Sequence, residues 1–326
     1  MKAVIPVAGL GTRLRPHTFT VPKPLLHVAG KPIIAHIIDN ISSLSIEEII
    51  LVYGENGESV VDFVREYWKG TVKGVLQREL MGLGHAVYQT KDLINEKDRL
   101  LVILGDTIIE GESIKSSSLD RDFIAVKEVD DPRRFGVVEL DEEGYIRGVE
   151  EKPDRPKSNL AIVGLYYFTS TGLLFEGLSY IMERDIKTKG EYQLTDALAY
   201  MLERGWRPLA VRIEGWYDCG KPETLLETNR ILLGKTGSKY EIPGSLIVPP
   251  VFIEKDVEIK NSIIGPYVSI ASGAMISNSI VTDSIINREA IVENISMTSS
   301  ILGQKAQVKG GLRRFNVGDF SKVELG

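Results

Sequence analysis

Residues 3–13 read Ala3-Val4-Ile5-Pro6-Val7-Ala8-Gly9-Leu10-Gly11-Thr12-Arg13, an apolar run that passes directly into a glycine-rich turn. Further apolar runs cover 49–53, 72–77 and 100–104, and stretches of helical length near 32–44, 57–68 and 84–94 lie between the runs. Strands that are buried on both faces have this continuous apolar pattern, so the alternation predicts a three-layer α/β domain with a mostly parallel sheet. Later strand-like segments (122–129, 136–140, 145–150, 160–168) and helices near 170–184, 193–203 and 222–233 are expected to extend the same domain.

The pattern changes after residue 240, where an aliphatic side chain recurs every five or six residues. A mostly small residue stands two positions before each of these side chains. One aliphatic and one small inward position per repeat is typical of the hexapeptide repeats of a parallel β-helix, in which each aliphatic stacks on the one a coil earlier. A run of ordinary short strands is the alternative. The recurring positions are Ile253, Ile259, Ile264, Ile270, Ile276, Val281, Ile286, Val292, Met297, Leu302 and Val308.

Length and charge narrow the classes of function. The 326 residues suffice for two domains with sizeable cores. Lys and Arg number 39 against 45 Asp and Glu, a net charge of −6, so no basic surplus exists to hold a nucleic acid or an anionic membrane. The single cysteine, Cys219, excludes an intrachain disulfide and a cysteine-rich zinc site. Since the N-terminal apolar run is also too short for a signal peptide, we expect a soluble, cytoplasmic protein.

The glycine-rich turn is followed by several cations. Its backbone N–H groups are expected at the carboxyl edge of the sheet, where phosphate can bind. The turn lacks the third glycine of the dinucleotide-binding pattern, and Gly30-Lys31-Pro32 does not match a P-loop. A highly charged triphosphate suits what remains, and a solvated basic loop is the alternative. The cations are Arg13, Arg15, Lys23 and Lys31.

Two aspartates are candidate metal ligands. Asp106 follows the apolar run 100–104 at the same edge of the sheet, and Asp218 stands between an aromatic stretch and a glycine turn. An Mg²⁺ site needs only one or two carboxylates plus substrate oxygens, although Asp106 would serve equally well as a helix N-cap. Further along, Lys152 is placed to reach a second anion and Glu151 to accept hydrogen bonds from sugar hydroxyls, unless this segment is a charged surface hairpin.

Taken in chain order, these motifs resemble the sugar-1-phosphate nucleotidyltransferase family, in particular glucose-1-phosphate thymidylyltransferases and their uridylyl and guanylyl relatives. The resemblance implies a Rossmann-like catalytic domain over 1–238 and a left-handed parallel β-helix of hexapeptide repeats over 239–326. It also implies a role for each matching residue. The implied catalytic residues are Arg13, Lys23, Asp106, Lys152 and Asp218, with Asp106 and Asp218 binding Mg²⁺; the nucleotide-binding residues are Ala8, Gly9, Leu10, Gly11, Thr12, Gln77 and Gly82; the sugar-binding residues are Gly136, Glu151 and Ile162.

The implied reaction joins a nucleoside triphosphate to a sugar 1-phosphate and releases pyrophosphate. It needs no general base, because a phosphate monoester is already largely dianionic at neutral pH. We expect dTTP as the nucleotide, with UTP as the alternative, and glucose 1-phosphate as the sugar. Mannose-1-phosphate guanylyl transfer and a bifunctional uridylyltransferase/acetyltransferase remain open. All four histidines precede residue 86, which argues against acyl transfer in the β-helix, so we expect this part to support assembly into a homo-oligomer.

Overall fold

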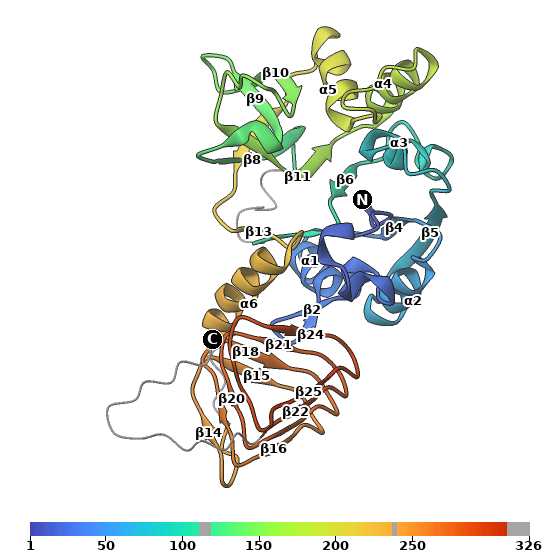
Figure 1. The fold of residues 1–326 in the computed structure, drawn as a ribbon. Helices are drawn as coiled ribbons and strands as arrows, with labels where there is room; N and C mark the ends of the chain where they lie inside the picture. The colour runs from blue at the N-terminus through green and yellow to red at the C-terminus, as the bar shows by residue number, and fades with distance from the viewer. Residues whose placement is uncertain (111–118, 237–239, 312–326) are drawn as a thin grey trace. The chain divides into compact units, whose positions relative to one another are not determined.

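The computed structural model describes residues 1–110, 119–236 and 240–311, and these residues form two compact units (Figure 1). Unit 1 comprises Met1–His27 and Lys31–Leu225, and unit 2 comprises Val28–Gly30 and the chain from Leu226 onward. The domain boundary that we expected at 238/239 lies outside the described residues. Helix α6 (Pro222–Thr236) therefore begins in unit 1 and continues into unit 2.

The centre of unit 1 is a parallel sheet whose strands are the predicted apolar runs. It runs in the order β5 (Thr71–Leu76), β4 (Glu48–Tyr53), β1 (Lys2–Pro6) and β6 (Leu100–Ile103). Val4 of β1 pairs with Ile50 on one side and with Val102 on the other. Because all four strands point the same way, the turns that leave β1 and β6 emerge at one edge of the sheet.

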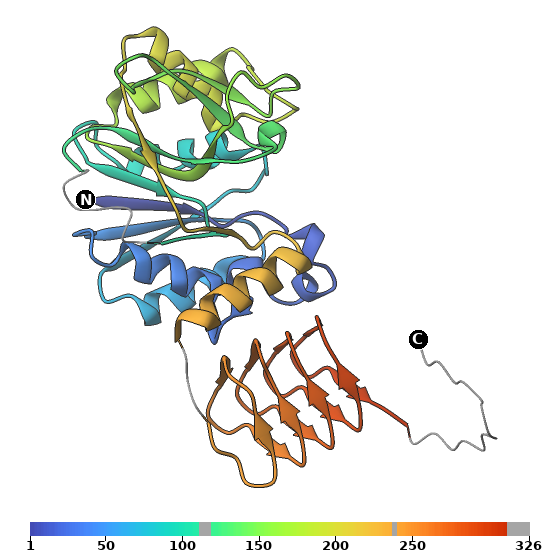
Figure 2. The same ribbon diagram turned by 90° about the vertical axis from the view of Figure 1, so that its left-hand side faces the viewer.

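Helices cover both faces of this sheet. Helices α1 (Ile33–Ile41) and α2 (Glu58–Tyr67) lie on one face, with α4 (Gly172–Glu183) and α5 (Leu194–Glu203) on the opposite side (Figure 2). Buried residues of α3 (Leu83–Tyr88), α4 and α5 share one core cluster with Val4 and Val52. The predicted three-layer α/β arrangement is therefore confirmed. None of the helices in the described ranges has the length and apolar content needed to span a bilayer.

The later strands extend the same sheet, as expected, but mostly in antiparallel fashion, with β12 alone among them pairing parallel, with β8. Strand β11 (Leu160–Phe168) pairs antiparallel with β6, β8 and β9, and β9 pairs antiparallel with β10. The pairing of β11 with β8 shifts between Ile162 and Tyr166, where Gly164 has a φ of +85°. This irregularity bends the strand where it passes the end of β6. The remaining members of the sheet are β8 (Phe123–Glu128), β9 (Gly136–Leu140), β10 (Ile146–Glu151) and β12 (Leu209–Arg212).

Two small two-stranded sheets complete unit 1 and its boundary. Strand β7 (Thr107–Ile109), directly after β6, pairs antiparallel with β13 (Trp216–Asp218). Strands β2 (His27–Val28) and β3 (Lys31–Pro32) form the other. None of these strands was predicted, because runs of two or three residues carry no readable periodicity.

Unit 2 contains the parallel β-helix that the repeats predicted. Three parallel four-stranded sheets each take one strand from every coil, and the coils stack in Figure 2. The register pairs Ile253 with Ile270, Ile270 with Ile286 and Ile286 with Leu302, so each inward aliphatic does stack on the one a coil earlier. The sheets are β14 (Leu246–Ile247), β17 (Ile263–Ile264), β20 (Ile280–Val281) and β23 (Ser296–Met297); β15 (Val251–Ile253), β18 (Val268–Ile270), β21 (Ile285–Ile286) and β24 (Ile301–Leu302); and β16 (Glu258–Lys260), β19 (Met275–Ser277), β22 (Ile291–Glu293) and β25 (Gln307–Lys309).

The corners of the β-helix depend on left-handed backbone conformations. A non-glycine residue with positive φ stands three positions before almost every inward aliphatic, and Gly273 takes the same place before Ile276. A single left-handed residue turns the chain sharply enough for the next short strand to begin. At one corner the side-chain amide of Asn261 donates to Oδ1 of Asn278, and that of Asn278 donates to Oδ1 of Asn294, so the hydrogen bonds run from coil to coil. The other left-handed residues are Asp256, Tyr267, Asp283, Glu289, Ser299 and Lys305.

Candidate active site

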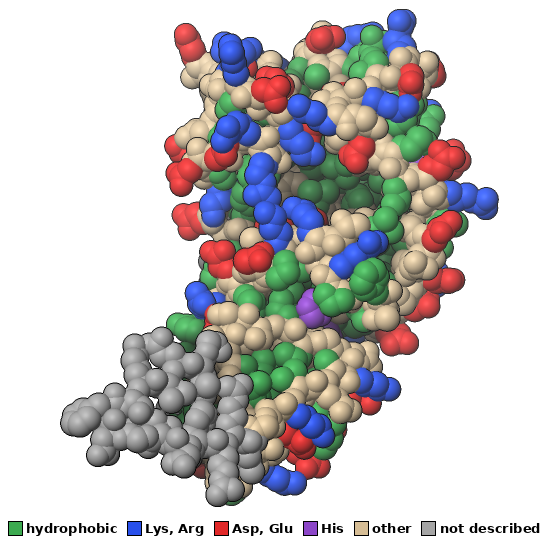
Figure 3. All heavy atoms as spheres, in the orientation of Figure 1, with side chains coloured by type: hydrophobic (Ala, Val, Ile, Leu, Met, Phe, Trp, Pro, Cys, Tyr) green, Lys and Arg blue, Asp and Glu red, His purple; other side chains and the backbone are tan. Residues whose placement is uncertain are grey.

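The carboxyl edge of the sheet in unit 1 opens into three adjoining cavities of about 610, 550 and 600 Å³. The first and second share Gly9 and Lys23, and the first and third share Arg13, Asp106 and Lys152. Figure 3 shows this face of the unit hollowed, with Lys and Arg side chains beside the hollow. The glycine turn, Asp106 and Lys152 therefore border one continuous space.

The glycine turn lies at the centre of this space. Gly11 has a φ of +60°, and a Cβ there would lie 2.9 Å from Cγ2 of Thr18, so both the backbone and the packing require glycine. A Cβ at Gly9 would meet nothing within 4 Å, which leaves the backbone open to the cavity. The short helix Thr12–Leu14 then carries Arg13 along the wall of the first and third cavities.

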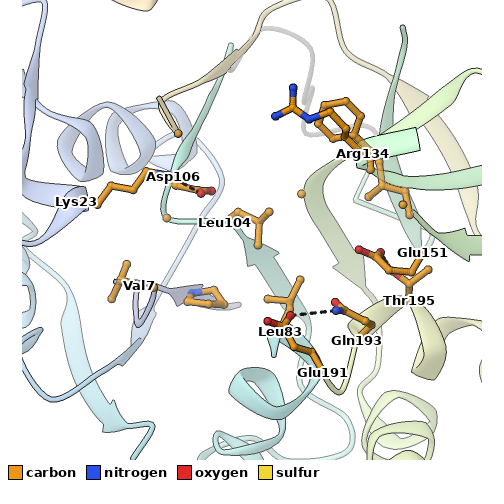
Figure 4. A pocket seen from close by; sticks show the side chains of 18 of the residues that line it. Val7, Lys23, Leu83, Leu104, Asp106, Arg134, Glu151, Glu191, Gln193 and Thr195 are labelled. Atoms are coloured by element: carbon orange, nitrogen blue, oxygen red, sulfur yellow. Dashed lines mark hydrogen bonds and ion pairs between the residues drawn. The ribbon is translucent and has the colours of Figure 1, made fainter. Parts of the chain in front are cut away.

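Lys23 and Asp106 form an ion pair at the base of the first cavity (Figure 4). Lys23 Nζ donates to Oδ2 of Asp106 at 2.7 Å, and the lysine side chain is only 8% exposed whereas the aspartate retains 41%. Burial alone would raise the pKa of Asp106. The charge and hydrogen bond of Lys23, a hydrogen bond from Thr107 and the charge of Arg13 outweigh burial and hold this pKa below its ordinary value. Asp106 is thus an ionised carboxylate with an open side.

Asp218 reaches the same place through the pairing of β7 with β13. In this register Asp218 lies opposite Thr107, and the backbone N–H of Cys219 donates to the carbonyl of Asp106 at 3.2 Å. A Cβ on Gly220 would lie 2.7 Å from Oδ1 of Asp218 and 3.0 Å from Nη2 of Arg13. Glycine at this position therefore lets the guanidinium approach the second carboxylate.

The opposite wall of the first cavity carries Glu151 and Lys152. The Thr195 hydroxyl donates a hydrogen bond to Oε2 of Glu151 at 2.7 Å (Figure 4). Nζ of Lys152 lies 3.1 Å from Oε1 of Glu151. Lys152 has a φ of +44°, and its backbone N–H donates to Phe135 O at 3.0 Å. A Cβ on Gly136 would lie 3.0 Å from Cδ1 of Ile162 and 3.1 Å from Oε2 of Glu151, so these predicted residues are immediate neighbours.

The two residues assigned to the base lie beside the second cavity. Gln77 is 3% exposed and lines this cavity, together with Ala8 and Leu10 of the glycine turn. Gly82 does not line any of the three cavities, but its carbonyl accepts a hydrogen bond from Nε2 of Gln77 at 3.3 Å. With φ at +107°, Gly82 precedes helix α3 in a conformation that other residues avoid.

Several lining residues were missed by the sequence analysis. They are Arg134 and Phe135 immediately before Gly136, Glu191, Gln193 and Thr195 around the start of α5, and Gly164 at the irregularity of β11. Figure 4 shows Arg134, Glu191 and Gln193 around the cavity opposite Lys23 and Asp106. The signal for Arg134 was its position next to Gly136 in Arg133-Arg134-Phe135-Gly136, a cationic run before a predicted sugar contact.

The donor set suits a divalent cation of the Mg²⁺ type. Within the described ranges, no three His, Cys, Asp or Glu side chains converge to hold a metal by themselves. Mg²⁺ characteristically takes one or two carboxylates and completes its shell with water and substrate oxygens. Asp218 at the end of β13 and Asp106 directly before β7 both line the third cavity with Arg13 of the glycine turn, and they match that requirement.

Comparisons with known proteins agree with this arrangement. The chain is 38% identical over 251 residues to the bifunctional protein GlmU of Methanocaldococcus jannaschii, an alignment that covers 76% of this chain and 59% of that protein's length. It is 31% identical over 360 positions to a glucose-1-phosphate thymidylyltransferase of Streptomyces antibioticus, covering 100% of this chain and 99% of that one. A UDP-glucose pyrophosphorylase solved with UDP-glucose matches with a TM-score of 0.64 at 29% identity, over 72% of this chain and 98% of that chain.

The family model described as nucleotidyl transferase matches residues 2–235. That range holds the glycine turn, both aspartates and every residue that lines the three cavities. The chain belongs to the nucleotidyl transferase family.

Proposed function

We propose that this protein is a sugar-1-phosphate nucleotidyltransferase whose catalytic part is residues 1–238. The observation that carries the proposal is the convergence of three cations (Arg13, Lys23 and Lys152) and two carboxylates (Asp106 and Asp218) on joined cavities of unit 1. These side chains come from widely separated parts of the sequence. A cluster of this kind suits a reaction between two polyanions, because each anion needs its own counter-charge.

The chemistry fits the residues. An oxygen of the sugar phosphate forms a bond to the α-phosphorus of the triphosphate, the bond from that phosphorus to the bridging oxygen breaks, and its electron pair leaves with pyrophosphate. Among the described residues that line the first cavity, none is His, Cys or Ser. Catalysis then rests on alignment and charge stabilisation rather than on a nucleophile activated by a base.

The residues divide this work between them. The Gly9–Arg13 turn and Lys23 hold the triphosphate, and Lys152 holds the sugar phosphate. Asp106 and Asp218 would bind Mg²⁺, which when present supplies positive charge to the phosphate oxygens. Because the charge of Lys23 keeps Asp106 ionised, the carboxylate is available to a cation at neutral pH.

For the substrates we propose a pyrimidine triphosphate, dTTP before UTP, and glucose 1-phosphate. The relative of 99% coverage is named a glucose-1-phosphate thymidylyltransferase, and the solved neighbour is a UDP-glucose pyrophosphorylase. Gln77 would pair with the imide edge that thymine and uracil share, while Gly136, Glu151 and Ile162 would line the sugar pocket. A 5-methyl group is worth only about 1 to 3 kcal/mol in an apolar pocket, so we expect both nucleotides to react.

For residues 239–326 we propose a role in self-association. Acyl transfer usually relies on a histidine base, and no histidine follows residue 85. Acetyl transfer, one of the alternatives left open by the sequence, is therefore not proposed for this part of the chain. Sedimentation of the full chain against the isolated residues 1–238 tests the assignment, because loss of the β-helix should lower the oligomeric state.

A matrix of four nucleoside triphosphates against four sugar 1-phosphates, with pyrophosphate release as the readout, tests the function. We expect dTTP and UTP with glucose 1-phosphate to give the highest kcat/KM. A preference of about tenfold or more for GTP with mannose 1-phosphate would overturn the substrates and leave the reaction class intact. Absence of pyrophosphate release in every combination would overturn the reaction class itself.

A further inference from the structure

The two polar atoms of the Gln77 side-chain amide differ in their hydrogen bonding. Its Nε2 lies 3.3 Å from the carbonyl oxygen of Gly82 and 2.9 Å from Nδ1 of His85, so both amide hydrogens have acceptors. Among the described residues, no donor bonds the other end, Oε1. Because the buried side chain lines the second cavity, Oε1 is the polar atom it offers to a ligand.

His85 is held in place by α3 and its neighbours. The ring is 8% exposed, and its Nε2 lies 2.9 Å from the side-chain amide of Gln89 on the far side from Gln77. Burial lowers the pKa of the imidazole, against the opposing effects of the charge and the backbone carbonyl of Glu79. The ring is therefore neutral near pH 7, with one nitrogen that donates and one that accepts.

The carbonyl of Gly82 favours Nδ1 as the nitrogen that accepts. If Nδ1 carried the proton, the Gln77 amide would have to turn its oxygen toward the ring, and this oxygen would then face the Gly82 carbonyl with no hydrogen between them. The favourable arrangement has Nδ1 accepting from Gln77 and the Nε2 proton donated to Gln89. Two acceptors thus hold the amide in one orientation.

We propose that His85 is a positioning residue that selects the nucleotide base, by holding Oε1 of Gln77 toward the second cavity. The proposal rests on the proposed function, in which Gln77 meets the base. An acceptor at this position pairs with the N3–H of uracil or thymine and repels the N3 lone pair of cytosine. The glutamine alone could serve either base by rotating its amide, so the discrimination comes from His85 together with Gly82.

The test compares UTP with CTP, which differ only on the base edge in question. Dissociation constants of the two nucleotides are measured by titration calorimetry for the wild-type protein and for His85→Leu, His85→Asn and Asp62→Asn. We expect the wild type to favour UTP by about tenfold or more, and His85→Leu to reduce the ratio to about threefold or less. In His85→Asn, Oδ1 replaces the Nδ1 acceptor and should retain the ratio. Asp62→Asn, at an exposed position of α2 that makes none of these contacts, is the control and should also retain it.

A folded His85→Leu protein with the wild-type ratio would overturn the proposal, and so would equal weakening of UTP and CTP. Because binding is measured apart from turnover, a protein that distinguishes the nucleotides but releases no pyrophosphate would refute the proposed function and leave the role of His85 standing.

The wild-type protein supplies a second measurement that needs no folded Leu variant. Protonation makes Nδ1 a donor and turns the Gln77 amide, so the UTP/CTP ratio should fall as the ring protonates, below a pKa that burial lowers from the ordinary value of 6.5. The titratable groups that face the ring are Glu79 and Tyr192. His85→Asn, which has no ring to protonate, should show a constant ratio. A wild-type ratio that changes no more than that of His85→Asn, over the pH range in which NMR shows the His85 ring to protonate, would contradict the proposal.

Discussion

Unit 1 and unit 2 use long-range contacts in opposite ways. In unit 2 the corner asparagines bond across 16 or 17 residues, and the aliphatic positions pair at the same spacing from coil to coil. In unit 1 the ion pair of Lys23 and Asp106 spans 83 residues, and the bond from Thr195 to Glu151 spans 44. A repeated contact can be read from a period, whereas a contact made once cannot. The candidate active-site residues lie in unit 1, where such single contacts bring them together.

The meaning of a positive φ differs between the units in the same way. In unit 2 such residues recur at the corners and serve the fold. In unit 1 Lys152 adopts a φ of +44° directly after β10, on the wall of the first cavity. This conformation costs a lysine about 1 kcal/mol or more, which local contacts such as the hydrogen bond from the Lys152 N–H to the carbonyl of Phe135 must offset.

The largest effect is expected from the two aspartates. Asp106→Ala and Asp218→Ala should each lower kcat by about a thousandfold or more, because each removes a carboxylate proposed to hold the cation. Steady-state pyrophosphate release measures the loss, and circular dichroism checks that both units stay folded. Asp62→Asn, an exposed carboxylate of α2, is the control and should be neutral. Near-wild-type turnover in both alanine variants would refute the metal assignment.

The next largest effects should distinguish the roles of two basic side chains, Arg13 and Lys152. Arg13→Ala should reduce kcat by about a hundredfold, because its charge meets the triphosphate where negative charge redistributes. Lys152→Ala should instead raise mainly the KM for sugar phosphate. Lys157→Ala, which removes a lysine that is 72% exposed, provides a baseline. Equal losses of kcat and of affinity for both substrates in the two test variants would contradict this division.

A core substitution in unit 2 should affect stability without affecting chemistry. Ile276 is 1% exposed and stacks between Ile259 and Val292, so Ile276→Ala should destabilise unit 2 by about 2 to 5 kcal/mol. Thermal unfolding followed by circular dichroism measures the change. Its neighbour Met275 points outward at 42% exposure, and Met275→Ala should change stability by less than about 0.5 kcal/mol. A large fall in kcat for Ile276→Ala would show that the β-helix contributes to catalysis.

The smallest expected effect is a change in stability caused by substitutions at one corner of the β-helix. Asn278 has a φ of +48°, and Asn278→Ala should cost about 1 kcal/mol because alanine tolerates this conformation poorly. Asn278→Gly loses the same amide hydrogen bonds, but glycine adopts the left-handed conformation without strain. The difference in stability between the two variants therefore measures the cost of that backbone conformation. Denaturant unfolding of both variants measures it, and identical stabilities would mean that the hydrogen bonds matter more than the left-handed turn.

The sequence predicted regular elements well and their convergence poorly. Strand β11 matches its predicted range of 160–168, and the stacking in unit 2 followed from the period. The antiparallel placement of β11 beside β6 had no local signal, because strand direction depends on partners chosen in the folded state. The pairing of β7 with β13 was missed for the same reason. Asp106 and Asp218 were therefore linked by resemblance, and only the structure shows that the pairing of β7 with β13 places Asp218 opposite Thr107, the residue after Asp106.

The ribbon of β7 and β13 has a consequence for dynamics. Each of its two strands contributes three residues, and at one end the N–H of Cys219 donates to the carbonyl of Asp106. So short a ladder is among the elements that open by local unfolding, and opening would separate the two carboxylates. A ligand that bridges Asp106 and Asp218 must then slow hydrogen–deuterium exchange at Cys219, by a factor set by its own affinity. The amide of Cys219 thus becomes a reporter of cation occupancy that is independent of turnover.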